Sequence, residues 1–448
     1  MDQTALSAAV AKFSAKFCNE LEKNKSVVSS PLSAEFVLAL LTLGATEPTL
    51  TEILKALGIK NEKLIRGSFS KVTSKLKSLK GITLDVANKV YIMEGKYDLK
   101  PELKKDAIEV FDAELEKIDF KKSTDAAKRI NSWVEEKTNN KIKDLLPPDC
   151  FDALTRLVLV NALYFKGTWK TQFSLKNTTK LPFHINAATT VDVPMMYQEE
   201  KFYYKESSDL NAQLLAMPYV GDEARMLIVL PKEVEGLDAL LTKLAQGHNI
   251  MNDINKMSYI KVHVTIPKFK IETEIDLNDL LPKLGIKQIF NKEYSGLTKI
   301  LNEEEPLYVS KAIQKAFIEV NEEGAEAAAA TAVKKKKKSK KNKVLKHQAV
   351  VADHPFLAIV VVKKKRRCCK RGLKPFTLFW SIFRGRKQSC VTKAYCCFRR
   401  GFKRKNHGST YCTRQYPKCK AKRPKGSSRK RSSIRQSIKR SSKRLAKR

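Results

Sequence analysis

The sequence predicts an α+β fold, in which several helices pack around large and mostly antiparallel β-sheets. Three observations lead to this prediction. Apolar residues recur at helical spacing between residues 5 and 60, residues 157–165 form a nearly continuous apolar run, and short β-like segments alternate with turns in residues 181–275. A chain of 448 residues can bury a substantial core, so a globular body is expected.

The N-terminal region is predicted to be helical. Its first apolar stripe consists of Leu6, Val10, Phe13 and Phe17. Spacings of three and four residues place these side chains on one face of a helix. Two further helical stripes lead to Gly44 and Gly58, which are suitable residues for ending a helix.

The middle of the chain contains two strand patterns with a helical pattern between them. Ile82–Met93 alternates between apolar and polar residues, as a strand with one buried face does. Residues 126–138 have helical spacing, with Ile130, Trp133 and Val134 on one side. Residues 157–165 are apolar at almost every position, which indicates a strand covered on both faces.

Positive charge is concentrated in two segments. Residues 363–448 contain 33 Lys and Arg and no acid, and residues 334–346 contain nine Lys and no acid. Removing the first group from the formal net charge of +40 leaves +7 for residues 1–362, and removing the second leaves −2. A nearly neutral domain at residues 1–362 is therefore predicted to carry a basic loop and a basic tail.

The tail at residues 363–448 has the composition of a solvated, disordered segment. It combines a charge run with scattered Ser and Gly, and it contains no acids that could pair with its cations. One apolar island interrupts it, Phe376–Phe383. A segment of this kind binds polyanions through counterion release, which makes nucleic acid a candidate partner.

The sequence as written favours a cytoplasmic or nuclear protein. It begins with Met1-Asp2 and lacks the basic start and apolar run of a signal peptide. No stretch has the ~18 apolar residues that span a membrane. Only Cys18 and Cys150 lie in residues 1–362, which does not suggest a disulfide framework. If the N-terminus were incomplete, an extracellular location would be possible, and Asn177 would be a glycosylation acceptor.

No enzyme constellation stands out, and neither a metal nor a cofactor is expected. The histidines of the body lie in unrelated sequence contexts, and each is predicted to be structural. They are His184, His248, His263, His347 and His354. The cysteine pairs of the tail lack the histidine spacing of a zinc site.

A run of small residues between acids and lysines is the most informative segment. It consists of Glu322, Glu323, Gly324, Ala325, Glu326, Ala327, Ala328, Ala329, Ala330 and Thr331. Five lysines follow closely, at residues 334–338. As a strand, the segment would place the side chains of Ala325, Ala327, Ala329 and Thr331 on one face, where they fit between close neighbours. On composition alone, an alanine-rich helix end or linker is the alternative.

The order of motifs resembles the serpins, the serine-protease-inhibitor superfamily, over roughly residues 5–362. The segment just described, preceded by residues 309–321 and followed by residues 352–356, is similar to the reactive-loop region of that family. The other landmarks are residues 29–33, 161–169, 193–196, 217–219 with 227–231, and 267–269 with 280–285. The resemblance implies a monomer with three mostly antiparallel sheets and an exposed reactive loop at about residues 322–350. It also implies that the native fold is metastable.

The resemblance also implies a protease inhibitor rather than an enzyme. Members of the family offer the loop to a serine protease, form an acyl-enzyme, and insert the hinge as a strand of a central sheet. The hinge rule of the family places the reactive bond between Lys338 and Ser339, while a longer loop would shift it to Lys340 or Lys341. Lysine at this bond suits a trypsin-like protease or one that cleaves multibasic sites.

The family pattern further implies a sheet-opening region and some departures from it. The region is formed by Ser30, Asn161, Trp169 and Gln314, and Gln314 stands where many relatives have histidine. Inward-facing lysines at 335 and 337 are expected to strain insertion beyond Val333 and to favour turnover of the inhibitor as a substrate. The last core strand is predicted to be missing, with only a weak match at residues 381–386.

Two other functions stay open at this point. The serpin body could be the scaffold of a nuclear or nucleic-acid-binding protein that uses the tail, with tail aromatics stacking on bases. The chain could also be a non-inhibitory serpin. The alanine-rich hinge argues against that function, because such members usually carry bulky or charged residues there.

Overall fold

Two hydrogen-bonded sheets organise the residues that the computed structural model describes, which are 3–303, 305–324, 348–362 and 376–384. These residues fall within one compact unit, Met1–Ser389, and the second unit, Cys390–Arg448, lies outside the described residues. The predicted α+β class is confirmed. Among the described strands, three pairs are parallel, β4 with β11, β2 with β3 and β9 with β12, so these sheets are mostly antiparallel as predicted.

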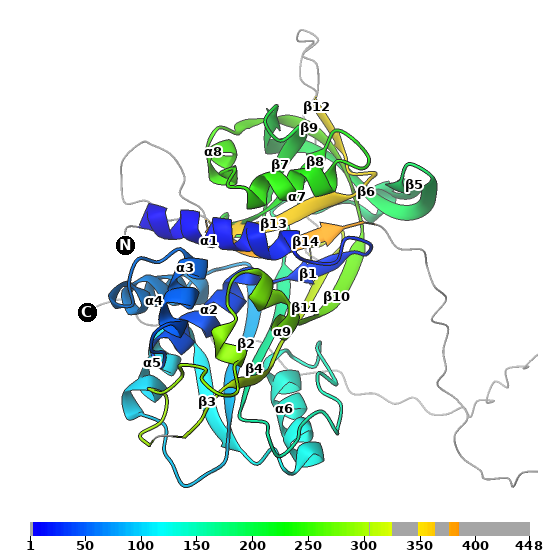
Figure 1. Cartoon of the computed structure of the whole chain (residues 1–448). Helices are drawn as coiled ribbons and strands as arrows, with labels where there is room; N and C mark the ends of the chain where they lie inside the picture. The colour runs from blue at the N-terminus through cyan, green and yellow to red at the C-terminus, as the bar shows by residue number, and fades with distance from the viewer. Residues whose placement is uncertain (1–2, 304, 325–347, 363–375, 385–448) are drawn as a thin grey trace, which may run out of the picture. The chain divides into compact units, whose positions relative to one another are not determined.

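The five-stranded sheet has the order β10-β11-β4-β2-β3. Its strands are β2 (Ile82–Met93), β3 (Ala113–Ile118), β4 (Leu157–Gly167), β10 (Phe269–Asp276) and β11 (Val309–Val320). The apolar run of the sequence becomes β4, which lies at the centre of this sheet and is buried on both faces at nearly every position. Figure 1 shows α6 (Ser123–Lys137) lying across one face of the sheet.

The nine-stranded sheet has the order β1-β14-β13-β8-β7-β6-β9-β12, and β5 pairs with β6. Its strands are β1 (Val27–Ser29), β5 (Thr178–Asn186), β6 (Thr189–Ser207), β7 (Ala212–Pro218), β8 (Ala224–Pro231), β9 (Ser258–Pro267), β12 (Gln348–Val351), β13 (Phe356–Val362) and β14 (Phe376–Phe383). Three separate sheets were expected. The long strand β6 pairs with β5 at one end and with β7 at the other, and it thereby joins two of them into one network.

Helices cover both sheets. They are α1 (Gln3–Asn19), α2 (Pro31–Thr42), α3 (Thr49–Leu57), α4 (Lys63–Lys77), α5 (Pro101–Phe111), α6, α7 (Leu237–Ala245), α8 (Ile250–Asn255) and α9 (Leu277–Lys283), with short 3₁₀ turns at Leu175–Asn177 and Gln288–Phe290. In Figure 1, α1 runs along β13 and β14. None of the described helices is long and apolar enough to cross a membrane.

Helix α2 is buried along its whole length and begins at the centre of the five-stranded sheet. Ser30 is its N-cap, where the hydroxyl accepts a hydrogen bond from the Ser33 amide at 3.3 Å, and Pro31 occupies the first helical position. Both are favoured choices for a helix start. The local sequence therefore fixes where α2 begins, and this places Ser30 and Ser33 against the strands.

The predicted absence of the last core strand is wrong. β14 comes from the apolar island and pairs antiparallel with β13, from Phe356 opposite Phe383 to Val362 opposite Phe376. On its other side it pairs with β1. The Phe383 ring lies 4.9–5.3 Å from the rings of Phe183, Phe269 and Phe356. Residues 376–384 thus belong to the body rather than to the tail that was predicted to begin at residue 363.

Candidate functional site

The centre of the five-stranded sheet is a parallel seam between β4 and β11. Its register runs from Lys311 opposite Val158 to Ile318 opposite Phe165. Parallel pairing is slightly less stable per residue than antiparallel pairing. The chain leaves β11 at Val320 and enters the predicted hinge two residues later, so a strand that turned back from Gly324 would run antiparallel to both β4 and β11.

A cluster of buried polar side chains lies across this seam, and we call it the seam cluster. Its members are Ser30, Ser33, Asn88, Asn161 and Gln314, each no more than 3% exposed. The strand register places Asn161 of β4 directly opposite both Asn88 of β2 and Gln314 of β11. Three amides from adjacent strands thereby meet the start of α2.

Gln314 connects both sides of the seam. Its Nε2 donates to Asn161 Oδ1 at 2.7 Å and to the Ser30 carbonyl at 2.9 Å, and its Oε1 accepts from the Ser30 amide at 2.9 Å. Asn161 Nδ2 donates in turn to Ser33 Oγ and Asn88 Oδ1. Opening the seam would break the bond between Gln314 and Asn161 and leave buried amides unpaired, which is costly.

The start of the hinge is held by Glu322, which is 4% exposed. Its carboxylate accepts hydrogen bonds from Lys268 Nζ and from Thr178 Oγ1, both at 2.9 Å, and its carbonyl accepts one from the Phe173 amide at 2.9 Å. Burial raises the pKa of Glu322, but the hydrogen bonds and the charge of Lys268 outweigh it, and the pKa is lowered. The carboxylate is therefore ionised at neutral pH.

Trp169 holds the same end of the sheet. Its indole Nε1 donates to the Asn321 carbonyl at 2.9 Å, its backbone amide donates to the Glu323 carbonyl at 3.1 Å, and its ring stacks on Tyr219 at 4.7 Å. Asn321 lies seven residues beyond Gln314 on the chain, which is about 23 Å along a strand. The four residues predicted to form one region therefore lie in two places. Ser30, Asn161 and Gln314 meet in the seam cluster, whereas Trp169 contacts the hinge.

Gly324 requires glycine for two reasons. Its φ is +101°, which side chains of L-residues rarely adopt. A Cβ at this position would also lie 2.3 Å from the Gly167 carbonyl oxygen and 2.4 Å from the Trp169 amide nitrogen. The turn is closed by Asn321, whose Oδ1 accepts from the Glu323 and Gly324 amides at 3.1 and 3.0 Å.

The remaining predicted site residues lie outside the described residues. They are the hinge residues Ala325, Glu326, Ala327, Ala328, Ala329, Ala330 and Thr331, and the reactive bond of Lys338 and Ser339. Within the described part of the chain, no group of His, Cys, Asp and Glu is arranged to hold a metal ion.

Four partners of the site were missed in the sequence. Ser33 and Asn88 complete the seam cluster, and Thr178 and Lys268 hold Glu322. Ser33 follows its cap residue by three positions, which was a usable signal for a contact at the start of the helix. The other three depend on which strands become neighbours, and no local pattern indicates that.

This arrangement of a central sheet, a parallel seam and a hinge that follows the seam strand defines a class of protein. A model of the serpin family, described as serine protease inhibitor, matches residues 8–371, and the chain belongs to this family.

Curated relatives and solved structures support the same family assignment. Antichymotrypsin-2 of Bombyx mori is 43% identical over 318 residues, which is 70% of this chain and 84% of that protein. Antitrypsin of the same organism is also 43% identical, over 70% of this chain and 80% of its own length. The structure of Serpin48, described as a highly specific serpin in the insect Tenebrio molitor, aligns with a TM-score of 0.74 and 34% identity, covering 86% of this chain and 100% of that one.

Proposed function

We propose that this serpin inhibits trypsin-like serine proteases by trapping them on a cleaved loop. The observation that most directly supports this proposal is the parallel seam between β4 and β11, which is followed by the hinge turn at Gly324. A protease would attack the bond after Lys338, and the acyl-enzyme would form at that carbonyl. The hinge would then enter between β4 and β11.

The topology of the seam supports such an insertion. A strand that turns back from Gly324 runs antiparallel to both neighbours, so one parallel pair would be replaced by two antiparallel pairs with better hydrogen-bond geometry. The residues that would face inward are Ala325, Ala327, Ala329 and Thr331. Small side chains at these positions can fit between the two strands once the bond between Gln314 and Asn161 has opened, and Glu326 would face water.

Lysine at the reactive bond favours a protease with an acidic specificity pocket. A relative named antitrypsin, at 43% identity, supports this choice of target class, while another relative is named antichymotrypsin. The lysine run also offers Lys340 and Lys341 as alternative bonds. Because burial of the Lys335 and Lys337 ammonium groups is costly, we expect part of the inhibitor to be cleaved as a substrate.

The test is incubation of the purified full chain with trypsin, followed by denaturing electrophoresis. An adduct that survives boiling is the expected result. The matched pair Ala327→Glu and Ala328→Glu makes the test specific, because the first side chain would face into the sheet and the second would face water. Ala327→Glu should lose the adduct and become a substrate, whereas Ala328→Glu should retain it. Loop cleavage without any adduct in the wild type would instead indicate a non-inhibitory serpin.

A further inference from the structure

The segment from Ala352 to Pro355 joins two unequal strands of the nine-stranded sheet. β12, which precedes it, has four residues and is the last strand in the sheet order, paired only with β9 among the described strands. β13, which follows it, lies inside the sheet between β8 and β14. The position of β12 therefore depends strongly on how this joining segment is fixed to the body.

Three contacts fix the joining segment. The Ala352 amide donates to the Thr265 carbonyl of β9 at 2.9 Å, and the His184 amide of β5 donates to the Asp353 carbonyl at 2.7 Å. The third contact is made by the His354 ring, which is 8% exposed. The first two contacts involve only backbone atoms and do not change with pH, whereas the third involves a titratable group.

Both nitrogens of the His354 ring face acceptors. Nδ1 lies 2.7 Å from Asp353 Oδ1, and Nε2 lies 2.8 Å from the carbonyl oxygen of Pro231 at the end of β8. A carboxylate and a carbonyl accept hydrogen bonds but do not donate them. A neutral imidazole has one N–H, so one of its nitrogens would direct a lone pair at an acceptor. Only the imidazolium satisfies both contacts.

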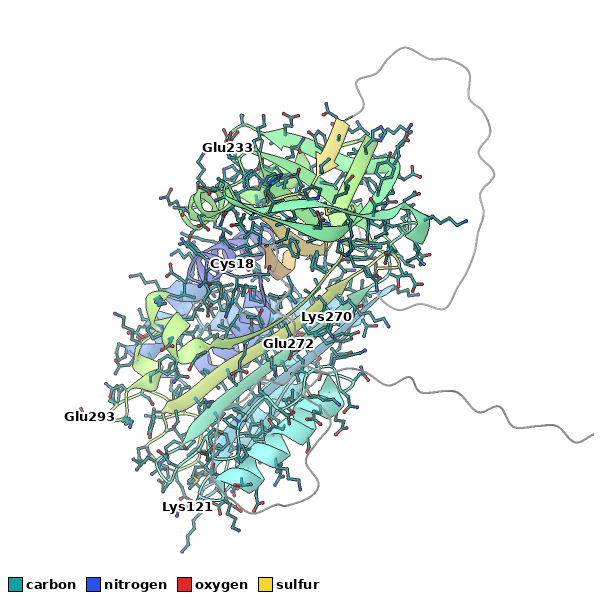
Figure 2. All side chains as sticks on the ribbon, turned by 90° about the vertical axis from the view of Figure 1, so that its right-hand side faces the viewer. Cys18, Lys121, Glu233, Lys270, Glu272 and Glu293 are labelled. Atoms are coloured by element: carbon teal, nitrogen blue, oxygen red, sulfur yellow. The ribbon has the colours of Figure 1, made fainter. Side chains whose placement is uncertain are left out.

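The charges around the ring favour the imidazolium. The Asp353 carboxylate contacts the ring directly, and the negative charge of Glu233, in the segment that follows β8, also stabilises the protonated ring. Figure 2 labels Glu233 at the end of the molecule that holds the nine-stranded sheet. His184 of β5 acts on Asp353 from the other side. Burial lowers the pKa of His354, but the hydrogen bonds to Asp353 and Pro231 and the two carboxylates outweigh it, so that the pKa is raised above its ordinary value of 6.5.

The sign of the pH dependence follows from this direction. A histidine whose pKa is higher in the folded than in the unfolded state contributes its full stabilisation below the unfolded value, near 6.5. The stabilisation is lost as pH rises through the folded value. The contact should therefore be complete in mild acid and weaken in mild alkali.

We propose that protonated His354 is a pH-sensitive pin that fixes edge strand β12 to the body of the sheet, and that deprotonation releases this strand. β12 is the strand through which the chain returns to the body after residues 325–347, so the pin controls the far attachment of the predicted reactive loop. That last consequence rests on the proposed function, whereas the pin itself does not.

A single substitution at Asp353 distinguishes the effect of His354 protonation from the effect of the two hydrogen bonds of its ring. In Asp353→Asn, the new amide nitrogen can donate to a neutral Nδ1 while Nε2–H still donates to the Pro231 carbonyl. This variant therefore keeps both hydrogen bonds with an uncharged ring, and it should hold β12 at every pH. His184→Gln is the control, because it replaces a neighbouring ring but keeps the backbone bond to the Asp353 carbonyl and leaves Asp353, His354 and Pro231 unchanged.

The experiment is hydrogen exchange of the peptides that cover residues 348–356 between pH 6 and 9, without any protease and corrected for intrinsic exchange rates. Protection in the wild type and in His184→Gln should fall by up to about tenfold for each unit of pH between the ordinary value of 6.5 and the folded pKa, and it should level off above the folded pKa. Protection in Asp353→Asn should stay constant, as should that of peptides from α6 in all three proteins. Histidine NMR of the wild type should report both ring nitrogens protonated at pH 6, below the ordinary value of 6.5.

Two results would overturn the pin. One is constant protection of residues 348–356 in the wild type across this pH range. The other is a His354 resonance that titrates at or below pH 6.5. Since neither measurement uses a protease, a negative result here is distinct from failure to form an adduct with trypsin, which would count against the proposed function alone.

Discussion

The seam at Gln314 in β11 and the chain at Glu322, just beyond the end of β11, are held by different kinds of interaction. At Gln314 the closure is neutral and almost fully buried, with every amide of the seam cluster paired to another. At the hinge the closure includes an ion pair in which the Glu322 side chain is 5% exposed and that of Lys268 is 42% exposed. Water can reach the cation as the pair separates, whereas nothing replaces the partners of Gln314. The hinge end is therefore expected to open first, and the seam cluster is expected to set the barrier.

The largest effect is expected from Gln314→Leu. This change removes all three hydrogen bonds of the side chain, so that the Ser30 amide and Asn161 Oδ1 each lose a partner in a buried site, while the Ser30 carbonyl still accepts the Ser33 and Ala34 amides. At about 1–3 kcal/mol for each unsatisfied group, a loss of several kcal/mol is expected. Thermal unfolding followed by circular dichroism measures it, with Gln246→Leu at the exposed end of α7 as the control. An equal shift for both variants would contradict the role of the seam cluster.

The second effect concerns the turn at Gly324. Gly324→Ala should destabilise the hinge turn, because the new Cβ meets backbone atoms and the residue retains a positive φ. Gly247→Ala is a matched control, since its φ of +113° is similar but nothing lies within 4 Å of its added Cβ. Strain alone costs about 1 kcal/mol or slightly more, so Gly324→Ala should cost clearly more than the control. Comparable melting temperatures would show that the close approach to Gly167 is unimportant.

A third test uses Glu35 of α2, which lies two residues from Ser33. Its carboxyl is 2% exposed, its Oε1 has no partner, and burial raises its pKa far above the ordinary value of 4.5. The folded state must therefore hold a proton that the unfolded state releases, and stability falls as pH rises above 4.5. Glu35→Gln should raise the melting temperature at pH 8 more than at pH 5. The exposed Glu109→Gln in α5 should not, and an unchanged pH profile in Glu35→Gln would contradict this account.

The smallest effect is expected at the ion pair. Lys268→Met should cost up to about 1 kcal/mol at neutral pH, because the lysine is partly solvated. Since the pKa of Glu322 is lowered, its contribution is present above 4.5 and disappears as pH falls through the folded value. Wild type and variant should therefore converge in acid. A difference that persisted there would mean that the lysine acts through packing and not through charge.

Local sequence determined the elements whose pattern is strong over several residues. β2 coincides with the alternating run Ile82–Met93, β4 with the continuous apolar run, and Gly58 ends α3 in a left-handed conformation with φ of +66°. The turn at Gly324 lies within the segment of small residues that was identified from the sequence. These features depend on neighbours within a few residues, so spacing and backbone preference are sufficient to predict them.

The tertiary structure decided what no local pattern contains. The register of three strands brought Asn88, Asn161 and Gln314 together, while about 23 Å of β11 separated Trp169 from them. Pairing with β13 and β1 turned an apolar island in a basic tail into the last core strand. One of the two acceptors that face the His354 ring, the Pro231 carbonyl, lies 123 residues away in the sequence. Strand pairing and burial are long-range choices, which is why the spacing of residues along the chain does not by itself indicate these contacts.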